Sequence, residues 1–194
     1  IQNPVISNND LEKIRTIDIE SFKAITIQML YPKAEGLNGL ENALENIIIQ
    51  VEKALKEKTN IIILSDRGVN QEFAPIPALL ACSYVNHQLN RLRKRSFFDI
   101  IIESAEPREP HHFATLFGYG ASAINPYMVN EIIRKQVKDG FITDMDEQKA
   151  VDNFNKAIGK GILKVMNKIG ISTLHSYRGS QIFEIVGFNS KFVE

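Results

Sequence analysis

The sequence has little cysteine and no excess charge of either sign. Cys82 is the single cysteine among 194 residues, which excludes an internal disulfide and any four-cysteine zinc or iron–sulfur site built from this chain alone. Lysine and arginine number 23, and so do aspartate and glutamate, so no net field attracts a nucleic acid or an anionic membrane. We therefore expect a reducing compartment and no nucleic-acid partner.

Long hydrophobic runs are also missing. No apolar stretch approaches the roughly 20 residues that span a bilayer, and the chain does not open with a basic stretch followed by an apolar core. We expect a cytoplasmic protein with no membrane partner. The chain begins at Ile1 rather than at a methionine and ends soon after the apolar stretch 182–188, so we expect both ends to be cut from a longer polypeptide.

What is present is the mixture of an ordinary globular domain. Hydrophobic residues make up 44% of the sequence and charged residues 24%. A chain of this length buries roughly 70% of the surface that its unfolded form exposes, which is enough for a core without metal or disulfide. We predict a single α/β domain over residues 1–194.

Three segments have the pattern of buried strands, and amphipathic segments separate them. Residues 22–30 alternate apolar with polar side chains, whereas residues 60–64 and 97–102 are short apolar runs typical of strands covered on both faces. Residues 40–55 and 78–92 carry apolar side chains on one helical stripe. This order predicts an α/β fold with a mainly parallel sheet, and both a half-barrel and a Rossmann-like arrangement remain open.

The second half of the chain predicts two further helices. Asn125 and Pro126 have the residue types of a cap and a first helical turn. Asp144 with Glu147 resembles a capping box, which would open a longer helix that ends near Gly170.

Two glycines interrupt the longer of these helices. Gly159 and Gly161 each cost roughly 1 kcal/mol relative to alanine inside a helix. Their presence predicts that another backbone passes close to this helix.

The segment from Gly118 to Ala123 satisfies the loose pattern G-x-G-x-x-A of dinucleotide-binding loops. In such a fold the loop follows a strand directly and opens a helix, so that its amides face a pyrophosphate. Here the pattern follows residues 111–117, and the next helix signal comes at Asn125. A nucleotide-binding loop and a glycine-rich packing turn are the two interpretations, and the packing turn is the favoured one.

Asp66 and Arg67 follow a predicted strand directly, at the edge where open α/β sheets gather their ligands. A ligand contact and an ion pair within the loop both fit this position, and the structural role is favoured. His111 and His112 are adjacent, so their side chains diverge and cannot chelate one ion as histidines four residues apart do.

Three glutamates follow the last predicted strand. Glu103, Glu106 and Glu109 are interpreted as the solvated entrance of a helix, with a metal site as the weaker alternative. A basic cluster at the predicted end of a helix is interpreted as cations that favour the negative end of the helix dipole, with contact to a phosphate or a nucleic acid as the weaker alternative. Its members are Arg91, Arg93, Lys94 and Arg95.

A cluster of cations and hydroxyls lies around Gly170, with few acidic residues among them. Such side chains could meet a carboxylate or a phosphate, although lysines four residues apart also fit a solvated helix strip. The cluster comprises Lys164, Lys168, Ser172, Ser176, Tyr177 and Arg178. No Ser-His-Asp or Cys-His arrangement stands out, because Cys82 lies on an apolar helix face. The residues alone therefore indicate an α/β domain with no catalytic, cofactor-binding or metal-binding residue.

Many ordered blocks, which extend over nearly the whole chain, resemble the glutamate synthase large chain. The most specific of them are Ile62-Ile63-Leu64-Ser65-Asp66-Arg67, Ala74-Pro75-Ile76-Pro77-Ala78, His111-His112-Phe113-Ala114, Gly118-Tyr119-Gly120-Ala121, Asn125-Pro126-Tyr127, Lys160-Gly161-Ile162-Leu163-Lys164 and Lys168-Ile169-Gly170-Ile171-Ser172. The order and the spacing of the blocks match that family too.

The resemblance implies a place in a larger enzyme. The family's large chain releases ammonia from glutamine at an N-terminal cysteine, passes it through an internal channel and adds it to 2-oxoglutarate in an FMN-bearing barrel beside an iron–sulfur cluster. This chain resembles the later part of the central domain, which reaches toward the FMN-binding domain near its C-terminus. The resemblance thus implies a scaffold that links the glutaminase and FMN domains of the same polypeptide and helps to shape the ammonia channel.

Activity and cofactors follow from the same resemblance. The full-length enzyme is an oxidoreductase and glutamine amidotransferase with FMN and an iron–sulfur cluster, whereas this fragment is expected to be inactive and to hold no cofactor. The alternative is a nucleotide- or flavin-binding module that uses the Gly118 to Ala123 loop. Fourteen residues are the predicted interdomain or channel contacts: Asp66, Arg67, His111, His112, Gly118, Gly120, Asn125, Tyr127, Lys164, Lys168, Ser172, Ser176, Tyr177 and Arg178.

Overall fold

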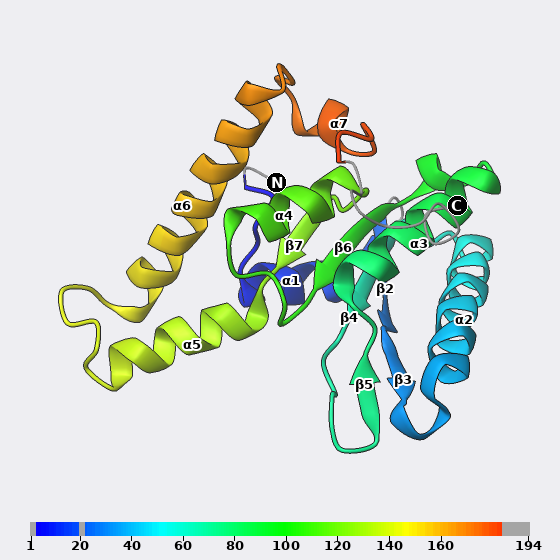
Figure 1. The fold of residues 1–194 in the computed structure, drawn as a ribbon, viewed down its shortest axis with the longest axis horizontal. Helices are drawn as coiled ribbons and strands as arrows, with labels where there is room; N and C mark the ends of the chain where they lie inside the picture. Colours follow the sequence, from blue (N-terminus) through cyan, green and yellow to red (C-terminus); the bar gives the residue numbers. More distant parts are fainter. Residues whose placement is uncertain (1–2, 20–21, 184–194) are drawn as a thin grey trace.

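The computed structural model describes residues 3–19 and 22–183, and its centre is a sheet whose parallel strands follow chain order (Figure 1). Strand β1 pairs antiparallel with β2, while β2, β4, β6 and β7 are mutually parallel. The bounds are β1 (Asp18–Ile19), β2 (Phe22–Gln28), β4 (Ile61–Ser65), β6 (Asp99–Glu103) and β7 (Ala123–Asn125). A Rossmann-like sheet reverses its strand order at a switch point, and this sheet does not, so the arrangement is the half-barrel.

Helices join the strands in the right order for such a barrel. Those that follow parallel strands are α2 (Gly36–Lys56), α3 (Ala78–Arg91), α4 (Pro110–Gly118) and α5 (Tyr127–Lys138). The remaining pieces are α1 (Asn8–Arg15), β3 (Leu30–Pro32), η1 (Lys33–Glu35), β5 (Phe73–Pro75), η2 (Arg95–Phe97), α6 (Glu147–Lys168) and α7 (Leu174–Tyr177). Strands β3 and β5 form a small antiparallel ribbon that projects below the sheet in Figure 1.

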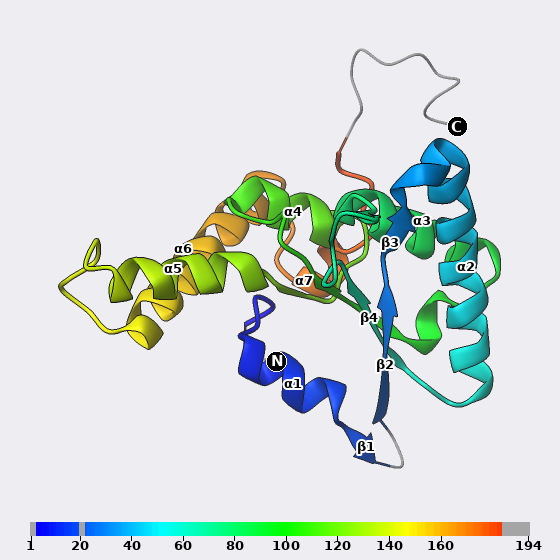
Figure 2. The ribbon, with the colours of Figure 1, turned by 90° about the horizontal axis from the view of Figure 1, so that it is seen from below.

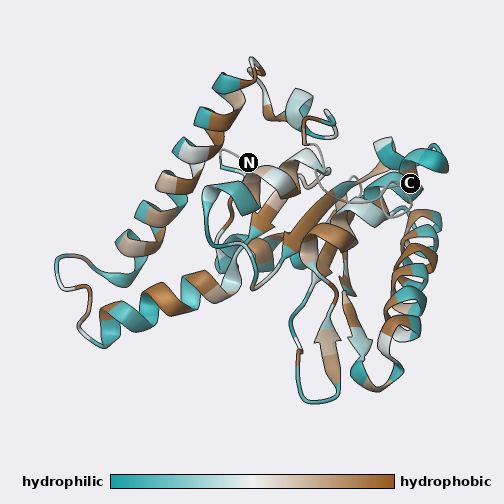
Figure 3. Ribbon diagram, viewed as in Figure 1, coloured by the Kyte–Doolittle hydropathy of each residue, from teal (hydrophilic) through white to brown (hydrophobic). Residues whose placement is uncertain are grey.

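Strands β4 and β6 are apolar and buried on both faces, as the sequence predicts. In β4, Ile62 and Leu64 belong to the large core beneath the helices, while Ile63 belongs to a second core on the opposite face. All three side chains are fully buried. Figure 3 shows the same contrast, with brown apolar strands at the centre and a helix α2 that alternates brown and teal. The two predicted buried runs and the alternating strand are confirmed.

The starts of two helices differ from the sequence prediction. Asn125 is the last residue of β7 rather than a cap, and α5 begins at Tyr127 after Pro126. The N-cap of α6 is Asp146, whose Oδ1 accepts a hydrogen bond from the Lys149 amide at 2.8 Å, so the proposed box at Asp144 is wrong. Both errors have one cause, because cap-type residues are frequent in loops and burial decides which of them is used.

Helix α6 packs on α4, and one of its two glycines makes this contact possible. A Cβ at Gly161 would lie 2.7 Å from Cβ of Pro110, the first residue of α4. A Cβ at Gly159 would meet nothing within 4 Å. The predicted close approach is therefore confirmed for Gly161 alone.

The N-terminal residues 4–19, here called the N-terminal strap, lie across the face of the sheet that the large helices leave open (Figure 2). At one edge Ile6 donates to the Ile124 carbonyl of β7 at 2.9 Å, and at the other edge β1 pairs with β2. Between them Leu11 of α1, 1% exposed, packs in the second core. The strap thus covers the inner face of the half-barrel and pairs with both of its outer strands.

Candidate functional site

Buried polar side chains gather where the parallel strands end. Because the carboxyl ends of parallel strands meet at one edge, residues that directly follow β4, β6 and β7 come together there. This carboxyl edge holds Ser65, Asp66, Glu103, Ser104 and Asn125, each at most 2% exposed. The sequence predicted Asp66 at this place, whereas Asn125 was predicted as a helix cap and Glu103 as a solvated glutamate. Ser65 and Ser104 were not named as site residues.

Glu103 is the centre of the carboxyl edge. Its carboxylate accepts hydrogen bonds from Ser65 Oγ at 2.6 Å, from Arg15 Nη2 at 2.9 Å and from Arg67 Nε at 2.5 Å. Burial alone would raise the pKa of Glu103, but the bonds from Ser65, Arg15 and Arg67 outweigh it and lower the pKa below its usual value. The interpretation of Glu103 as part of a solvated helix entrance is wrong, because its side chain is only 1% exposed.

Asp66 binds a neighbouring loop rather than its own. It accepts from Ser104 Oγ at 2.6 Å and from the Ala105 amide at 3.0 Å. The neighbouring Tyr127 phenol is buried and hydrogen-bonded to Asp66, and both effects raise the pKa of Tyr127. Arg67 pairs with Glu103, and its guanidinium lies 3.9 Å from the centre of the Tyr127 ring. Instead of the ion pair expected within the loop, Asp66 binds the loop after β6 and Arg67 pairs with Glu103 at the end of β6.

Asn125 connects the carboxyl edge to the N-terminal strap. Its side-chain amide donates to the Ile6 carbonyl and to Asn8 Oδ1, both at 3.0 Å. Asn130 of α5 donates to the same Asn8 oxygen at 3.2 Å. The strap is thus fixed to this edge at two places, by Arg15 at Glu103 and by these amides at β7.

Glu106, in the loop that follows β6, has a structural role as well. Glu106 Oε2 accepts from the Ala78 amide at 2.9 Å, so it caps the start of α3 from the loop between β6 and α4. Glu106 was interpreted as part of a solvated helix entrance, whereas in the structure its carboxylate caps the start of α3.

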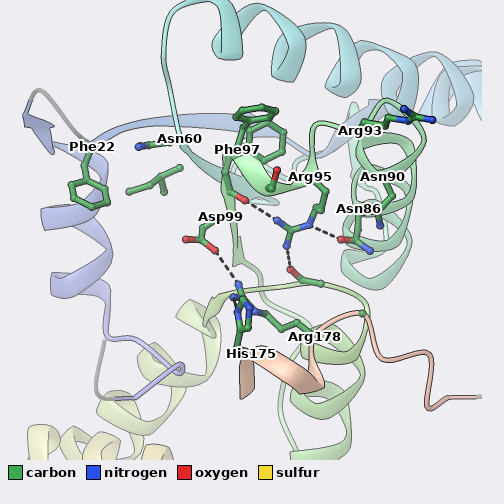
Figure 4. A pocket seen from close by; sticks show the side chains of 15 residues that line it. Phe22, Asn60, Asn86, Asn90, Arg93, Arg95, Phe97, Asp99, His175 and Arg178 are labelled. Atoms are coloured by element: carbon green, nitrogen blue, oxygen red, sulfur yellow. Dashed lines mark hydrogen bonds and ion pairs between the residues drawn. The ribbon is translucent and has the colours of Figure 1, made fainter. Parts of the chain in front are cut away.

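A hollow of about 850 Å³ lies at the opposite end of the strands, the amino edge (Figure 4). Arg178, which follows α7, donates there to Asp99 Oδ1 at 2.9 Å and to Ser122 Oγ. Its Nη2 lies 3.0 Å from Nδ1 of His175. Arg95 lines the same hollow. The predicted contact Arg178 and Arg95, which was interpreted as a helix-end cation, are therefore parts of one wall.

The Gly118 to Ala123 loop runs from the end of α4 to the start of β7, the reverse of the strand-to-helix order of a dinucleotide loop. Each amide from Tyr119 to Ser122 donates to a backbone carbonyl. A Cβ at Gly118 would lie 2.6 Å from the Phe183 ring, and one at Gly120 would lie 2.5 Å from Asn86 Oδ1. The glycines of this loop therefore permit close packing.

The other predicted contacts lie apart from both edges. Tyr177 is buried and donates to the Ala114 carbonyl at 3.0 Å, and its burial raises its pKa to about 12. Six of the predicted contacts have exposed side chains on or near α4, α6 and α7: His111, His112, Lys164, Lys168, Ser172 and Ser176. The structure does not bring these residues together into one site.

The carboxyl edge does not fit a flavin phosphate. Two buried carboxylates, Asp66 and Glu103, lie at the carboxyl edge, where a flavin phosphate would bring further negative charge. Cys82 is fully buried in α3, and burial raises its pKa to about 12, so it does not fit a thiolate ligand. Within residues 3–19 and 22–183 no His, Cys, Asp and Glu side chains form a group of three that could hold a metal ion. No helix in the same ranges is both long enough and apolar enough to cross a membrane.

Strand order and helix placement define the class of protein as half of a (β/α)8-type barrel. Solved structures agree: a flavocytochrome b2 with benzoylformate superposes with a TM-score of 0.56 at 12% identity, over 95% of this chain and 42% of that one. A mandelate oxidase with the monooxide FMN adduct gives a TM-score of 0.51 at 12% identity, over 68% of this chain and 37% of that one. At such identity the likeness concerns the fold alone.

The chain belongs to the glutamate synthase central domain family, whose profile matches residues 1–189. It is 40% identical over 194 residues to the glutamate synthase [NADPH] large chain of Bacillus subtilis, covering 100% of this chain and 12% of that protein. Identity is 38% to the glutamate synthase [NADH] of Schizosaccharomyces pombe, over 98% of this chain and 9% of that one. Identity is 34% to the ferredoxin-dependent glutamate synthase 2 of Synechocystis, over 100% of this chain and 13% of that protein. The chain thus spans about a tenth of the length of these relatives.

Proposed function

We propose that this chain is a non-catalytic part of a glutamate synthase, which sets the distance and orientation between the glutaminase site and the FMN site of the same polypeptide. The observation that carries the proposal is Glu103, at the edge where barrel enzymes hold their ligands. Its carboxylate is 1% exposed and takes hydrogen bonds from Ser65, Arg15 and Arg67. Internal contacts thus take the place that a substrate or a cofactor takes in a barrel enzyme.

The N-terminal strap supports the same proposal. A barrel enzyme closes its sheet with four further strands, whereas here α1 packs on Ile63 and Ile101 of the inner face. A half-barrel covered in this way has no open mouth on its inner face. A packed body of this kind is suited to hold two reaction centres at a fixed separation, and orientation contributes strongly to transfer between centres. In this function the exposed predicted contacts on α4, α6 and α7 meet neighbouring domains and help to shape the ammonia channel.

A flavin- or nucleotide-binding module is the second candidate, and the FMN adduct named for the mandelate oxidase neighbour favours it. The geometry of the Gly118 to Ala123 loop favours the scaffold instead. Its amides already donate to carbonyls, and Gly118 and Gly120 face side chains at a distance that leaves no room for a phosphate.

An assay of the purified chain tests the proposal. It is incubated with glutamine, and separately with 2-oxoglutarate, ammonia and a reductant, while a complete glutamate synthase serves as positive control in the same buffer. We expect glutamate formation no faster than in a blank without protein. Turnover that rises in proportion to the concentration of the chain would show that it carries a reaction centre, and the proposal would fail.

A further inference from the structure

The hollow at the amino edge carries more positive than negative charge. Among its lining residues that the structure describes, the arginines are Arg93, Arg95 and Arg178, and the single carboxylate is that of Asp99. With His175 counted as neutral, these three arginines and one aspartate give the lining a net charge of two positive charges. The hollow, of about 850 Å³, lies within the rough range of 300–1,000 Å³ for small-molecule sites.

Arg95 is a partly buried cation whose partners in the described chain are neutral. Its Nε donates to Asn86 Oδ1 at 2.6 Å, its Nη1 to the Phe98 carbonyl at 2.7 Å and its Nη2 to the Gly120 carbonyl at 2.8 Å. Burial and the nearby guanidinium of Arg178 lower the pKa of Arg95, and the charge of Asp99 offsets only part of this effect. A guanidinium has five N–H donors, so these three bonds fix its position and leave two donors for a ligand.

Asp99 supplies only part of the counter-charge of Arg95, because its carboxylate is hydrogen-bonded to Arg178 and acts on Arg95 through its charge alone. Arg178 Nη1 lies 2.9 Å from Asp99 Oδ1. Burial alone would raise the pKa of Asp99, but hydrogen bonds from Ser122 and Arg178 lower it, so the carboxylate stays charged. Within the described residues Arg178 is therefore paired with a carboxylate, whereas the hydrogen-bond partners of Arg95 are neutral, and Figure 4 shows both arginines on the wall of the hollow. A partly buried cation that is only partly compensated is stabilised when an anion joins it.

We propose that this hollow binds a small oxyanion with two negative charges, a phosphate monoester or a dicarboxylate, with Arg95 and Arg178 as its charged partners. Guanidinium groups match the geometry of phosphate and carboxylate oxygens. The rings of Phe97 and Phe22, 62% and 50% exposed, offer apolar surface at the rim for the organic part of such a ligand. The site lies at the opposite end of the strands from Glu103, so it does not depend on the proposed scaffold function.

Titration calorimetry of the purified chain tests this site, with inorganic phosphate and succinate as probes at constant ionic strength in chloride. We expect saturable binding of at least one probe, and the tighter one identifies the class of ligand. Arg178→Gln is the test variant, because Arg95 also holds two backbone carbonyls and its loss would disturb the fold. The expected loss is about tenfold in affinity, which corresponds to roughly 1.4 kcal/mol.

The matched control is Arg108→Gln, an exposed arginine outside the hollow, whose affinity for the probe is expected to equal that of the wild type. Circular dichroism shows whether each variant is folded. If Arg178→Gln is not, Arg178→Lys replaces it, because an ammonium cannot bind an oxyanion through two parallel hydrogen bonds and should also lose affinity. Absence of saturable binding of both probes would overturn the proposal. So would an equal loss in the control variant, since that result indicates an unspecific effect of net charge.

Discussion

Arg15 and Glu103, 88 positions apart in the sequence, form an ion pair of 2.9 Å between helix α1 and the end of strand β6. The pair attaches the N-terminal strap to the centre of the carboxyl edge. It also leaves Glu103 without room for a ligand, because Ser65 and Arg67 bind the same carboxylate. One contact thus both attaches the strap to the half-barrel and occupies the central carboxylate of the carboxyl edge.

Replacement of Glu103 by alanine is expected to destabilise the protein. Two arginines would lose their carboxylate, and the loss of one partner from a buried pair costs about 3–5 kcal/mol. We expect about 3 kcal/mol, the low end of that range, because Arg15 and Arg67 remain 25% and 44% exposed and can reach water. The free energy of unfolding in urea measures the effect. The control Glu109→Ala, whose side chain is 66% exposed, should change it little, and equal losses would contradict the assigned network.

The stability should depend on pH through Glu103. Its pKa in the folded protein lies below the ordinary 4.5, so its stabilising contribution is complete above that pH and disappears as the pH falls through the folded-state pKa. Glu103→Gln should therefore be less stable than the wild type near neutral pH, and the difference should shrink in acid. Urea unfolding at several values between about pH 7 and pH 3 measures this. Asp99, whose pKa is also lowered, should preserve part of the acid sensitivity in the variant.

The two glycines of α6 should respond in opposite ways to alanine. Gly159→Ala should raise the free energy of unfolding by about 1 kcal/mol, because alanine favours the helix and its Cβ meets nothing within 4 Å. Gly161→Ala should lower it, because the new Cβ would lie 2.7 Å from Cβ and Cγ of Pro110. Thermal or urea unfolding of the two variants decides the matter, and a gain of stability in both would show that α4 and α6 are not in contact there.

Gly120 should tolerate alanine less well than Gly140. Both have a positive φ, of +110° and +77°, so alanine strains the backbone at either position. At Gly120 the Cβ would also lie 2.5 Å from Asn86 Oδ1, the acceptor that holds Arg95. We expect the larger loss of thermal stability at Gly120. If Gly140→Ala, which meets no atom within 4 Å, were equally harmful, the packing of this turn would be wrong.

The long elements could be predicted from sequence because one physical signal dominates each of them. Apolar periodicity gave α2 and α6, and buried β-branched runs gave β4 and β6. The short elements α1 and β7 carry too few residues for periodicity, since a helix of 8 residues or a strand of 3 depends on tertiary contacts.

The site was harder to predict than the fold. Asp66 could be found, because its place directly after a predicted strand indicates the carboxyl edge. Asn125 was taken for a helix cap, since the short strand β7 that ends at this residue has no signal in the sequence. Glu103 was taken for a solvated glutamate, since its burial depends on Arg15, a residue from a helix that the sequence did not reveal. Arg95 was taken for a helix-end cation, although it holds the Gly120 carbonyl 25 positions away. Long-range pairs of this kind leave no local pattern in the sequence.

The proposed scaffold is tested most directly by coupling between the two reactions of a complete glutamate synthase that contains this domain. The measurement is the glutamate formed per glutamine hydrolysed, together with free ammonia, in the variant Arg15→Met and in the control Arg108→Met. The account predicts that Arg15→Met still hydrolyses glutamine and keeps its FMN, but forms less glutamate and releases ammonia, because the strap no longer holds the half-barrel rigid. Unchanged coupling in this variant, or a loss of FMN from it, would contradict the account.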